Sequence, residues 1–172
     1  MAVPPQGRSR TLVVLLLLLL SLSAGRVSSS SSSSSSCLRR DANRAVYAAA
    51  KSAGEAAGYV SHLLRSTSPN SVALKDCREL LGDSAEQLNK TARQLRRLRP
   101  ETFTWQVDNA LTWTSAALTN QDTCVQGLRE VMKGTSGKTR EAVVRRVSHV
   151  SRLTGNALHL INRLASTNGR GL

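Results

Sequence analysis

The chain has 172 residues and a strongly basic balance, with 24 lysines and arginines against 11 acids and a formal net charge of +13. This length supports one domain with one hydrophobic core and argues against a second domain. With so few acidic residues, the sequence offers few candidates for a pair of catalytic carboxylates. The odd count of three cysteines allows one internal disulfide and leaves one thiol over.

Residues 1–25 have the organisation of a secretory signal peptide. Arg8 and Arg10 precede an unbroken apolar run at 12–20, and small residues follow at 23–25. The apolar run is too short to span a bilayer comfortably, and no later segment is long and apolar enough to do so. We therefore expect cleavage at the end of this segment and secretion of a protein without a membrane span.

A run of nine serines, Ser28–Ser36, follows the signal peptide. It contains no apolar side chain to bury, so the sequence predicts a flexible spacer at 26–38. We expect the folded domain to occupy 39–166 and the last residues, 167–172, to form a disordered tail.

Apolar residues from Asp41 onward recur at helical spacing, and the breaks fall where turn residues cluster. Long helices joined by short turns pack as antiparallel neighbours. The predicted fold class is therefore all-α, an up-down-up-down four-helix bundle with one interhelical disulfide. The expected helices run from Asp41 to Arg65, from about Leu74 to the residue before Pro100, from about Thr102 to the break at 134–137, and from there to about 165.

Each expected helix has an inward stripe that the apolar periodicity defines. In the last helix the stripe is Val143, Val147, Val150, Thr154, Ala157, Ile161 and Leu164. In the second helix it is Leu74, Cys77, Leu81, Ala85, Leu88, Ala92 and Leu95.

Two cysteines test this arrangement, because residues that face each other across a helical hairpin lie equally far from its turn. Cys77 lies 21 residues before Leu98, and Cys124 lies 21 residues after Phe103. Both also fall on inward stripes, Cys77 on that of the second helix and Cys124 on that of the third. We predict a Cys77–Cys124 disulfide, which leaves Cys37 unpaired, either as an idle thiol or as a bridge to another chain.

The sequence contains no recognisable set of catalytic or metal-binding residues. His62, His149 and His159 have no spacing typical of metal ligands, and there is no C-x-x-C. A nucleophile elbow and a glycine-rich phosphate loop are also missing. We expect neither an enzyme nor a cofactor or metal, so the function must come from a surface.

One candidate surface is basic. Lysines and arginines crowd 90–99 and 133–163, and in the second segment only Glu141 opposes them. Such a surface attracts polyanions, which for a secreted protein are acidic polysaccharide and lipid headgroups rather than nucleic acid. The alternative is a solvated basic face without a partner.

A second candidate surface is the outer side of the third helix, where small and polar residues recur every three or four positions. Such a stripe would let another protein's backbone approach closely, and the alternative is an ordinary solvated helix face. The residues are Asn109, Thr112, Ala116, Thr119, Thr123 and Gly127.

One short motif points to a covalent modification. Asn89-Lys90-Thr91 has the pattern of an N-glycosylation acceptor. Asn89 follows the inward Leu88 without sharing its face. We therefore expect a glycan at Asn89 of the secreted protein.

Three segments carry a family resemblance. Residues 73–84, ALKDCRELLGDS, and residues 112–124, TWTSAALTNQDTC, each combine a cysteine with fixed neighbours, and residues 156–164, NALHLINRL, add a weaker pattern. They resemble the plant invertase and pectin methylesterase inhibitors. The resemblance covers about 41–165.

This resemblance implies a disulfide between the two cysteine-bearing helices, the pairing that the spacing also predicts. It implies a non-catalytic protein of the cell wall or apoplast that forms a stoichiometric complex with pectin methylesterase and caps its pectin-binding cleft. It further implies that the helix bearing the T-C motif takes part in that contact. The residues implied for target binding are Thr112, Ala116, Thr119, Asp122 and Thr123.

The sequence departs from the family pattern in two ways. The usual N-terminal helical hairpin with its own disulfide is missing, and the serine run and Cys37 occupy its place. The Pro-Lys-Phe tripeptide linked to invertase inhibition is absent, because Phe103 follows Thr102. This favours pectin methylesterase as target, with invertase as the alternative and a non-inhibitory bundle that binds acidic pectin or anionic surfaces as a second one. Because the chain stops at Leu172, we expect no fused esterase.

Overall fold

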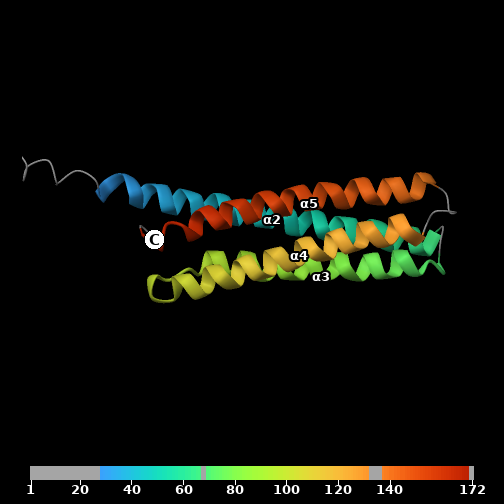
Figure 1. Cartoon of the computed structure of the whole chain (residues 1–172), viewed down its shortest axis with the longest axis horizontal. Helices are drawn as coiled ribbons and strands as arrows, with labels where there is room; N and C mark the ends of the chain where they lie inside the picture. The colour runs from blue at the N-terminus through green and yellow to red at the C-terminus, as the bar shows by residue number, and fades with distance from the viewer. Residues whose placement is uncertain (1–27, 67–68, 132–136, 171–172) are drawn as a thin grey trace, which may run out of the picture.

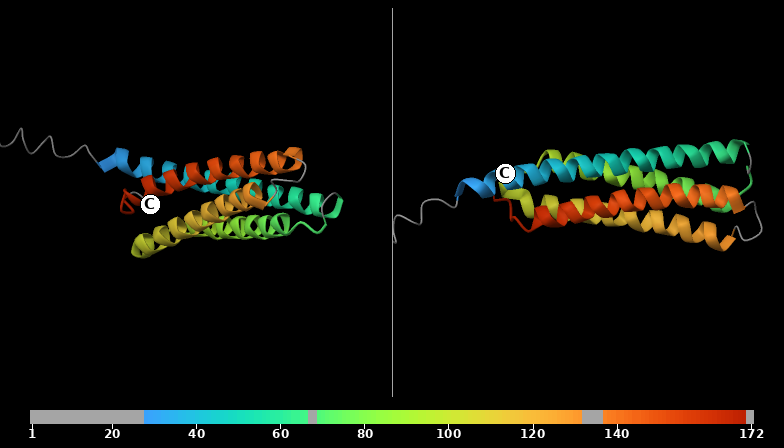
Figure 2. Two further views of the ribbon diagram at one scale, coloured as in Figure 1. Left: turned by 45° about the vertical axis from the view of Figure 1, so that its right-hand side comes forward. Right: turned by 90° about the horizontal axis from the view of Figure 1, so that it is seen from above.

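The computed structural model describes residues 28–66, 69–131 and 137–170, which form a four-helix bundle (Figure 1). Each helix contacts its neighbours in the chain, and the last contacts the first. In the described residues the diagonal pairs α2–α4 and α3–α5 make no contact, so the bundle is four-sided and antiparallel (Figure 2). The predicted fold class is confirmed. The helices are α2 (Ser28–Ser66), α3 (Val72–Arg96), α4 (Phe103–Val131) and α5 (Gly137–Ala165), with a 3-10 turn, η1 (Pro100–Thr102), before α4.

The core follows the predicted stripes closely. Every predicted inward residue of α5 is buried. In α3, Ala85 is only half-buried, whereas Ser84 and Thr91 are fully buried. Their hydroxyls can enter the core because they have hydrogen-bond acceptors there, as Ser84 Oγ donates to the Ala117 carbonyl at 3.0 Å.

The turn between α3 and α4 is held by one buried amide. Gln106 accepts a hydrogen bond from the Arg99 backbone N–H at 2.8 Å and donates one to the Arg97 carbonyl at 2.8 Å. Pro100 begins η1, where its missing N–H costs no helical hydrogen bond. These contacts fix the register of α3 against α4.

The N-terminal part of the chain differs from the prediction. The spacer expected at 26–38 is wrong for the described part, because α2 already begins at Ser28 rather than near Asp41. Serine is only about 0.5 kcal/mol per residue less favourable in a helix than alanine, and extending an existing helix adds one hydrogen bond per residue. The run contains no glycine or proline to stop that extension. The predicted signal peptide lies outside the described residues.

The C-terminal end also differs. Residues 167–170 form turns instead of a disordered tail, with hydrogen bonds from Thr167 N to the Leu164 carbonyl at 3.1 Å and from Asn168 N to the Ala165 carbonyl at 3.0 Å. Gly169 has φ +73° and lies against Phe103, so close that a Cβ would come within 3.1 Å of its ring. The other predicted tail residues, 171–172, and most of the 134–137 break lie outside the described residues.

A buried polar pair joins α4 to α5 and gives a stability prediction. Gln121 and Thr154 are both fully buried, and Gln121 Nε2 donates to Thr154 Oγ1 at 3.0 Å. Thr154→Val keeps the shape but removes the acceptor, so we expect it to lower the free energy of unfolding by about 1–3 kcal/mol in urea titrations. Adding Gln121→Leu removes the buried amide that Thr154→Val leaves without an acceptor, and should restore much of the lost free energy of unfolding. A double variant less stable than Thr154→Val would contradict this account.

Candidate functional site

A disulfide between Cys77 and Cys124 joins the beginning of α3 to the last part of α4, as predicted. Both residues are buried, and their Cα atoms lie 4.5 Å apart. Such a close approach requires small side chains along the interface. The disulfide therefore fixes the two helices against each other next to the surface on which the predicted binding residues lie.

Buried hydroxyls continue this close contact along α3 and α4. Thr91 Oγ1 lies 3.3 Å from Thr114 Oγ1, and each hydroxyl also bonds to the carbonyl four residues earlier in its own helix. Asn120 Nδ2 reaches Gln87 Oε1 at 3.5 Å nearer the surface. These paired polar groups add hydrogen bonds to the contact between α3 and α4.

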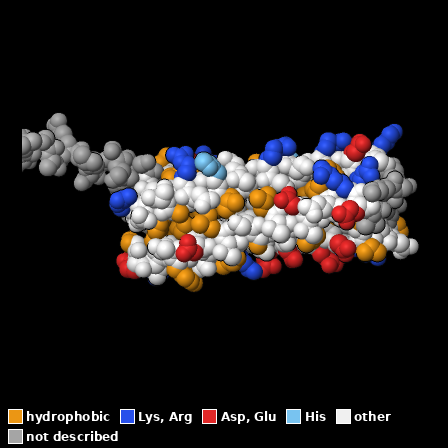
Figure 3. All heavy atoms as spheres, viewed as in Figure 1, with side chains coloured by type: hydrophobic (Ala, Val, Ile, Leu, Met, Phe, Trp, Pro, Cys, Tyr) orange, Lys and Arg blue, Asp and Glu red, His pale blue; other side chains and the backbone are white. Residues whose placement is uncertain are grey.

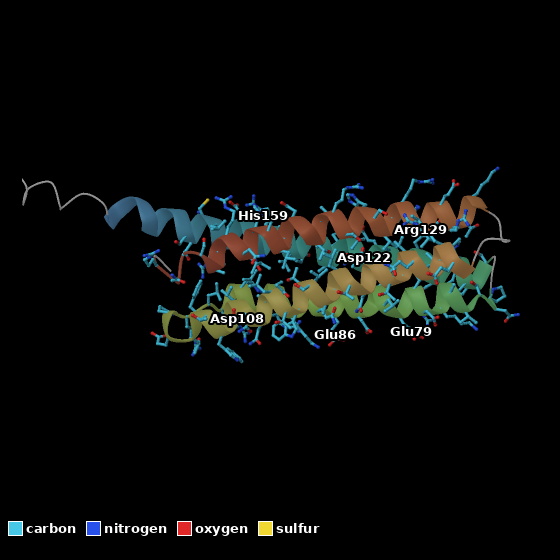
Figure 4. All side chains as sticks on the ribbon, in the orientation of Figure 1. Glu79, Glu86, Asp108, Asp122, Arg129 and His159 are labelled. Carbon is cyan, nitrogen blue, oxygen red and sulfur yellow. A yellow bond between two sulfur atoms is a disulfide. The ribbon has the colours of Figure 1, made fainter. Side chains whose placement is uncertain are left out.

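The predicted target-binding residues lie together on the outer side of α4. Thr112, Thr119, Asp122 and Thr123 are exposed and Ala116 is half-buried. Figure 4 labels Asp122 and, closer to the start of the helix, Asp108. The geometry therefore brings the five residues onto one side of one helix, although it does not test their role.

The threonines of this stripe are held in fixed orientations. Thr112, Thr119 and Thr123 each donate a hydroxyl hydrogen bond to the carbonyl four residues earlier, at 2.9, 3.2 and 2.9 Å. Threonine is also stiff because it is branched at Cβ. With the hydroxyl hydrogen used inside the helix, the surface presents methyl groups and acceptor lone pairs, and a partner would immobilise few new rotamers.

A groove of about 160 Å³ borders the stripe at the end of α4. Thr123 and Gly127 form its α4 side, and Val72, which is 65% exposed, lies at its α3 side. The remaining lining residues are Ala73, Asp76, Cys77, Leu80 and Cys124.

Trp105, 64% exposed, lies on α4 eighteen residues before Thr123. Eighteen residues are five helical turns, so Trp105 shares the outer side of the stripe at a distance of about 27 Å along the axis. Sequence reasoning missed Val72 and Trp105. Trp105 could have been found from this spacing alone.

The charge of α4 contrasts with that of the whole chain. Asp108, Asp122 and Glu130 oppose a single base, Arg129, so α4 carries a formal charge of −2. On α3, a hydrogen bond from Lys90 at 2.8 Å, together with the charge of the same ammonium, holds the pKa of Glu86 below its usual value. The α4 side is therefore not where the basic excess of the chain lies.

The other predicted residues lie away from this surface. Cys37 is exposed on α2, forms no disulfide, and has its thiol 3.7 Å from Asp41 Oδ2. Asn89 is exposed on α3, while Thr91 of the same acceptor motif is fully buried. Residues 28–66 form one continuous helix, so this part contains no N-terminal hairpin.

The three histidines are exposed and do not come together; Figure 4 shows His159 on α5, apart from the labelled acids. Within the described ranges, no three His, Cys, Asp or Glu side chains lie close enough to hold a metal ion. None of the described helices carries an apolar stretch sufficient to cross a membrane.

These features define a class: an all-α, disulfide-linked bundle with a stripe of small and polar residues along the outer side of α4. The chain belongs to the plant invertase/pectin methylesterase inhibitor family, because the sequence model of that family matches residues 19–160. This is a family of inhibitor proteins and not of enzymes, in agreement with the prediction. No solved structure matches the chain.

Several relatives are named pectinesterase inhibitors, all from Arabidopsis thaliana. Pectinesterase inhibitor 3 is 36% identical over 126 residues, 70% of this chain and 60% of the relative. Pectinesterase inhibitor 9 is 40% identical over 98 residues, 55% and 47% of the two chains. Pectinesterase inhibitor 6 is 44% identical over 96 residues, which are 55% of this chain and 44% of the relative. The matched part thus spans about half the length of these relatives.

Proposed function

We propose that this protein inhibits pectin methylesterase by forming a stoichiometric complex in which the outer side of α4 caps the enzyme's pectin-binding cleft. The observation that carries the proposal is the fixed, small-residue stripe on α4, with Trp105 at one end and Val72 beside the groove at the other. The names of the relatives support the target. Inhibition in this form is steric and needs no catalytic group.

The dimensions and stiffness of the surface suit such a complex. From Trp105 to Thr123 this side of α4 extends about 27 Å, which is the scale of a standard protein interface of roughly 800 Å² per partner. Exposed aromatic residues such as Trp105 are frequent anchors of interfaces. Small residues between the anchors allow the backbone of α4 to approach the wall of a cleft, and their fixed orientations reduce the entropy lost on binding.

Invertase is the alternative target, because the family name includes it. The sequence lacks the Pro-Lys-Phe tripeptide associated with that activity, since Thr102 precedes Phe103. We therefore place pectin methylesterase first. A non-inhibitory bundle that binds acidic pectin through its basic residues is a third possibility, with a different surface.

Titration of the purified protein against several pectin methylesterases at mildly acidic pH tests the proposal, with a parallel assay of sucrose hydrolysis by invertases. We expect a linear fall of esterase activity to an equivalence point and no effect on invertase. Activity against invertase alone would transfer the proposal to the alternative target. Inert behaviour in both assays would refute the inhibitory function.

We further propose that the protein is secreted to the cell wall after removal of residues 1–25, and that it carries a glycan at Asn89. The exposure of Asn89 leaves room for a glycan on the outer side of α3. Because Thr91 is buried in the folded bundle, addition would have to precede folding. Secretion places the protein in the compartment of its proposed target.

A further inference from the structure

The basic excess of the chain is concentrated on two of the four helices. Together α2 and α5 contain eleven lysines and arginines against three acids, a formal charge of +8. By the same count α3 and α4 contain six bases and seven acids, a charge of −1. In Figure 3 the blue side chains gather along the upper edge, over α5, and most red ones lie lower. The three acids can offset at most three of the eleven bases, so the two helices keep a large positive excess.

The cations on α5 are arranged as a line. Three cations, Lys138, Arg145 and Arg152, recur every seven residues, the imidazole of His159 continues the same spacing, and all four side chains are exposed. Seven residues are close to two helical turns, so these side chains follow one line about 32 Å long. Glu141 is the single acid on this helix. A line of cations along the long axis matches an extended, linear polyanion better than a compact ion.

A groove beside this line contains both cationic groups and hydrogen-bond acceptors. Its volume is about 300 Å³, and it lies at the contact of α2 with α5. Arg145, Arg146 and His149 line one side, and Ser52, Glu55 and Ala56 line the other. The Arg146 guanidinium is held 3.7 Å above the Tyr59 ring, and Glu55 Oε1 lies 3.9 Å from the Lys51 ammonium. Guanidinium groups bind carboxylates, while Glu55 and Ser52 can accept hydrogen bonds from sugar hydroxyls.

We propose that the α2–α5 surface, consisting of this line and this groove, binds a linear acidic polysaccharide through its uronate carboxylates. A lipid surface fits less well, because membrane-binding basic helices also expose large apolar residues. The exposed large apolar side chains of the described chain are Tyr47, Val72 and Trp105; of these only Tyr47 lies on α2 and none lies on α5. Although α5 packs against α4, the groove lies on the α2 side of α5, and α2 is diagonal to α4, so a polymer held along the α2–α5 contact would leave the outer side of α4 free. Only this last consequence rests on the proposed inhibitory function.

Binding of the secreted chain to polygalacturonate, without any esterase present, tests the proposal. Fully methylesterified pectin and vesicles of neutral and anionic phospholipid serve as comparison ligands. We expect binding to polygalacturonate that weakens steeply as salt rises, because the Debye length falls from about 30 Å at 0.01 M to about 10 Å at 0.1 M. Little binding to methylesterified pectin is expected, since its carboxyl groups are uncharged. Stronger binding to the vesicles, or equal binding to both pectins, would overturn the proposal.

A matched pair of variants separates a local surface from the overall charge. Arg145→Glu with Arg152→Glu should weaken binding by about tenfold or more. Lys75→Glu with Arg93→Glu, at exposed positions on α3, makes the same change in net charge and should have a much smaller effect. Equal losses would show that net charge alone drives binding. Helical circular dichroism confirms folding, and because the assay contains no esterase, its outcome is independent of inhibition.

Discussion

Cys77→Ala with Cys124→Ala should lower the free energy of unfolding by about 4 kcal/mol in the chain-entropy treatment of a loop closed across a sequence separation of 47 residues. The two sulfurs lie in the core of the α3–α4 pair, so the double variant also leaves a small void. Denaturant unfolding followed by circular dichroism measures the loss; the midpoint of unfolding should fall, and the slope should rise because the unfolded chain without the cross-link exposes more surface.

Cys37→Ser is the matched control for this experiment. Cys37 is exposed on α2 and forms no disulfide, so its replacement should change the free energy of unfolding by less than about 0.5 kcal/mol. A double variant as stable as the wild type would show that the disulfide does not constrain the unfolded chain. If Cys37→Ser instead lowered the free energy of unfolding strongly, the Cys37 thiol would have to make a stabilising contact that the bundle does not show.

Ala116→Arg should abolish most inhibition while leaving the bundle folded. Ala116 lies half-buried in the middle of the α4 stripe, where a long charged side chain would hold a partner's surface away from the helix. A disruption at the centre of an interface, where hot spots cluster, costs about 2 kcal/mol or more, which corresponds to a rise in the inhibition constant of about 30-fold or more. Inhibition of pectin methylesterase at several inhibitor concentrations measures this change.

The same substitution at an exposed alanine of α2, Ala48→Arg, provides the control. Ala48 lies on the helix diagonal to α4, so its replacement should leave the inhibition constant within about threefold of the wild type. Arginine is a good helix former at both sites, which keeps the two variants comparable in folding. Equal effects at the two positions would argue that contact does not occur through α4.

The sequence predicted the bundle and its register because both depend on strong, regular patterns. Apolar spacing placed the inward residues of α5, and equal distances from the α3–α4 turn paired Cys77 with Cys124. The burial of Ser84 and Thr91 was not predicted, because both are polar and lie outside the apolar stripe of α3. Their hydroxyls find hydrogen-bond partners in the core. The start of α2 at Ser28 was not predicted, because a run of identical serines has no apolar periodicity. Serine nevertheless permits a helix.

The candidate site could be predicted only in part. Residue spacing placed the small side chains on one side of α4, but their functional role came from family resemblance. Val72 lies outside that helix, and its place beside Thr123 depends on how α3 packs against α4. The division of charge between α2–α5 and α3–α4 likewise depends on which helices are adjacent, a property of the bundle rather than of any one segment.

The most direct test of capping is a binding measurement with pectin methylesterase in the presence of substrate-derived oligogalacturonides. Native mass spectrometry should detect a one-to-one complex, and titration calorimetry should show that oligomers occupying the enzyme's cleft compete with the inhibitor for it. The account predicts a fall in apparent affinity that grows in proportion to oligomer concentration. A complex that forms equally well on an enzyme saturated with oligomer would contradict it.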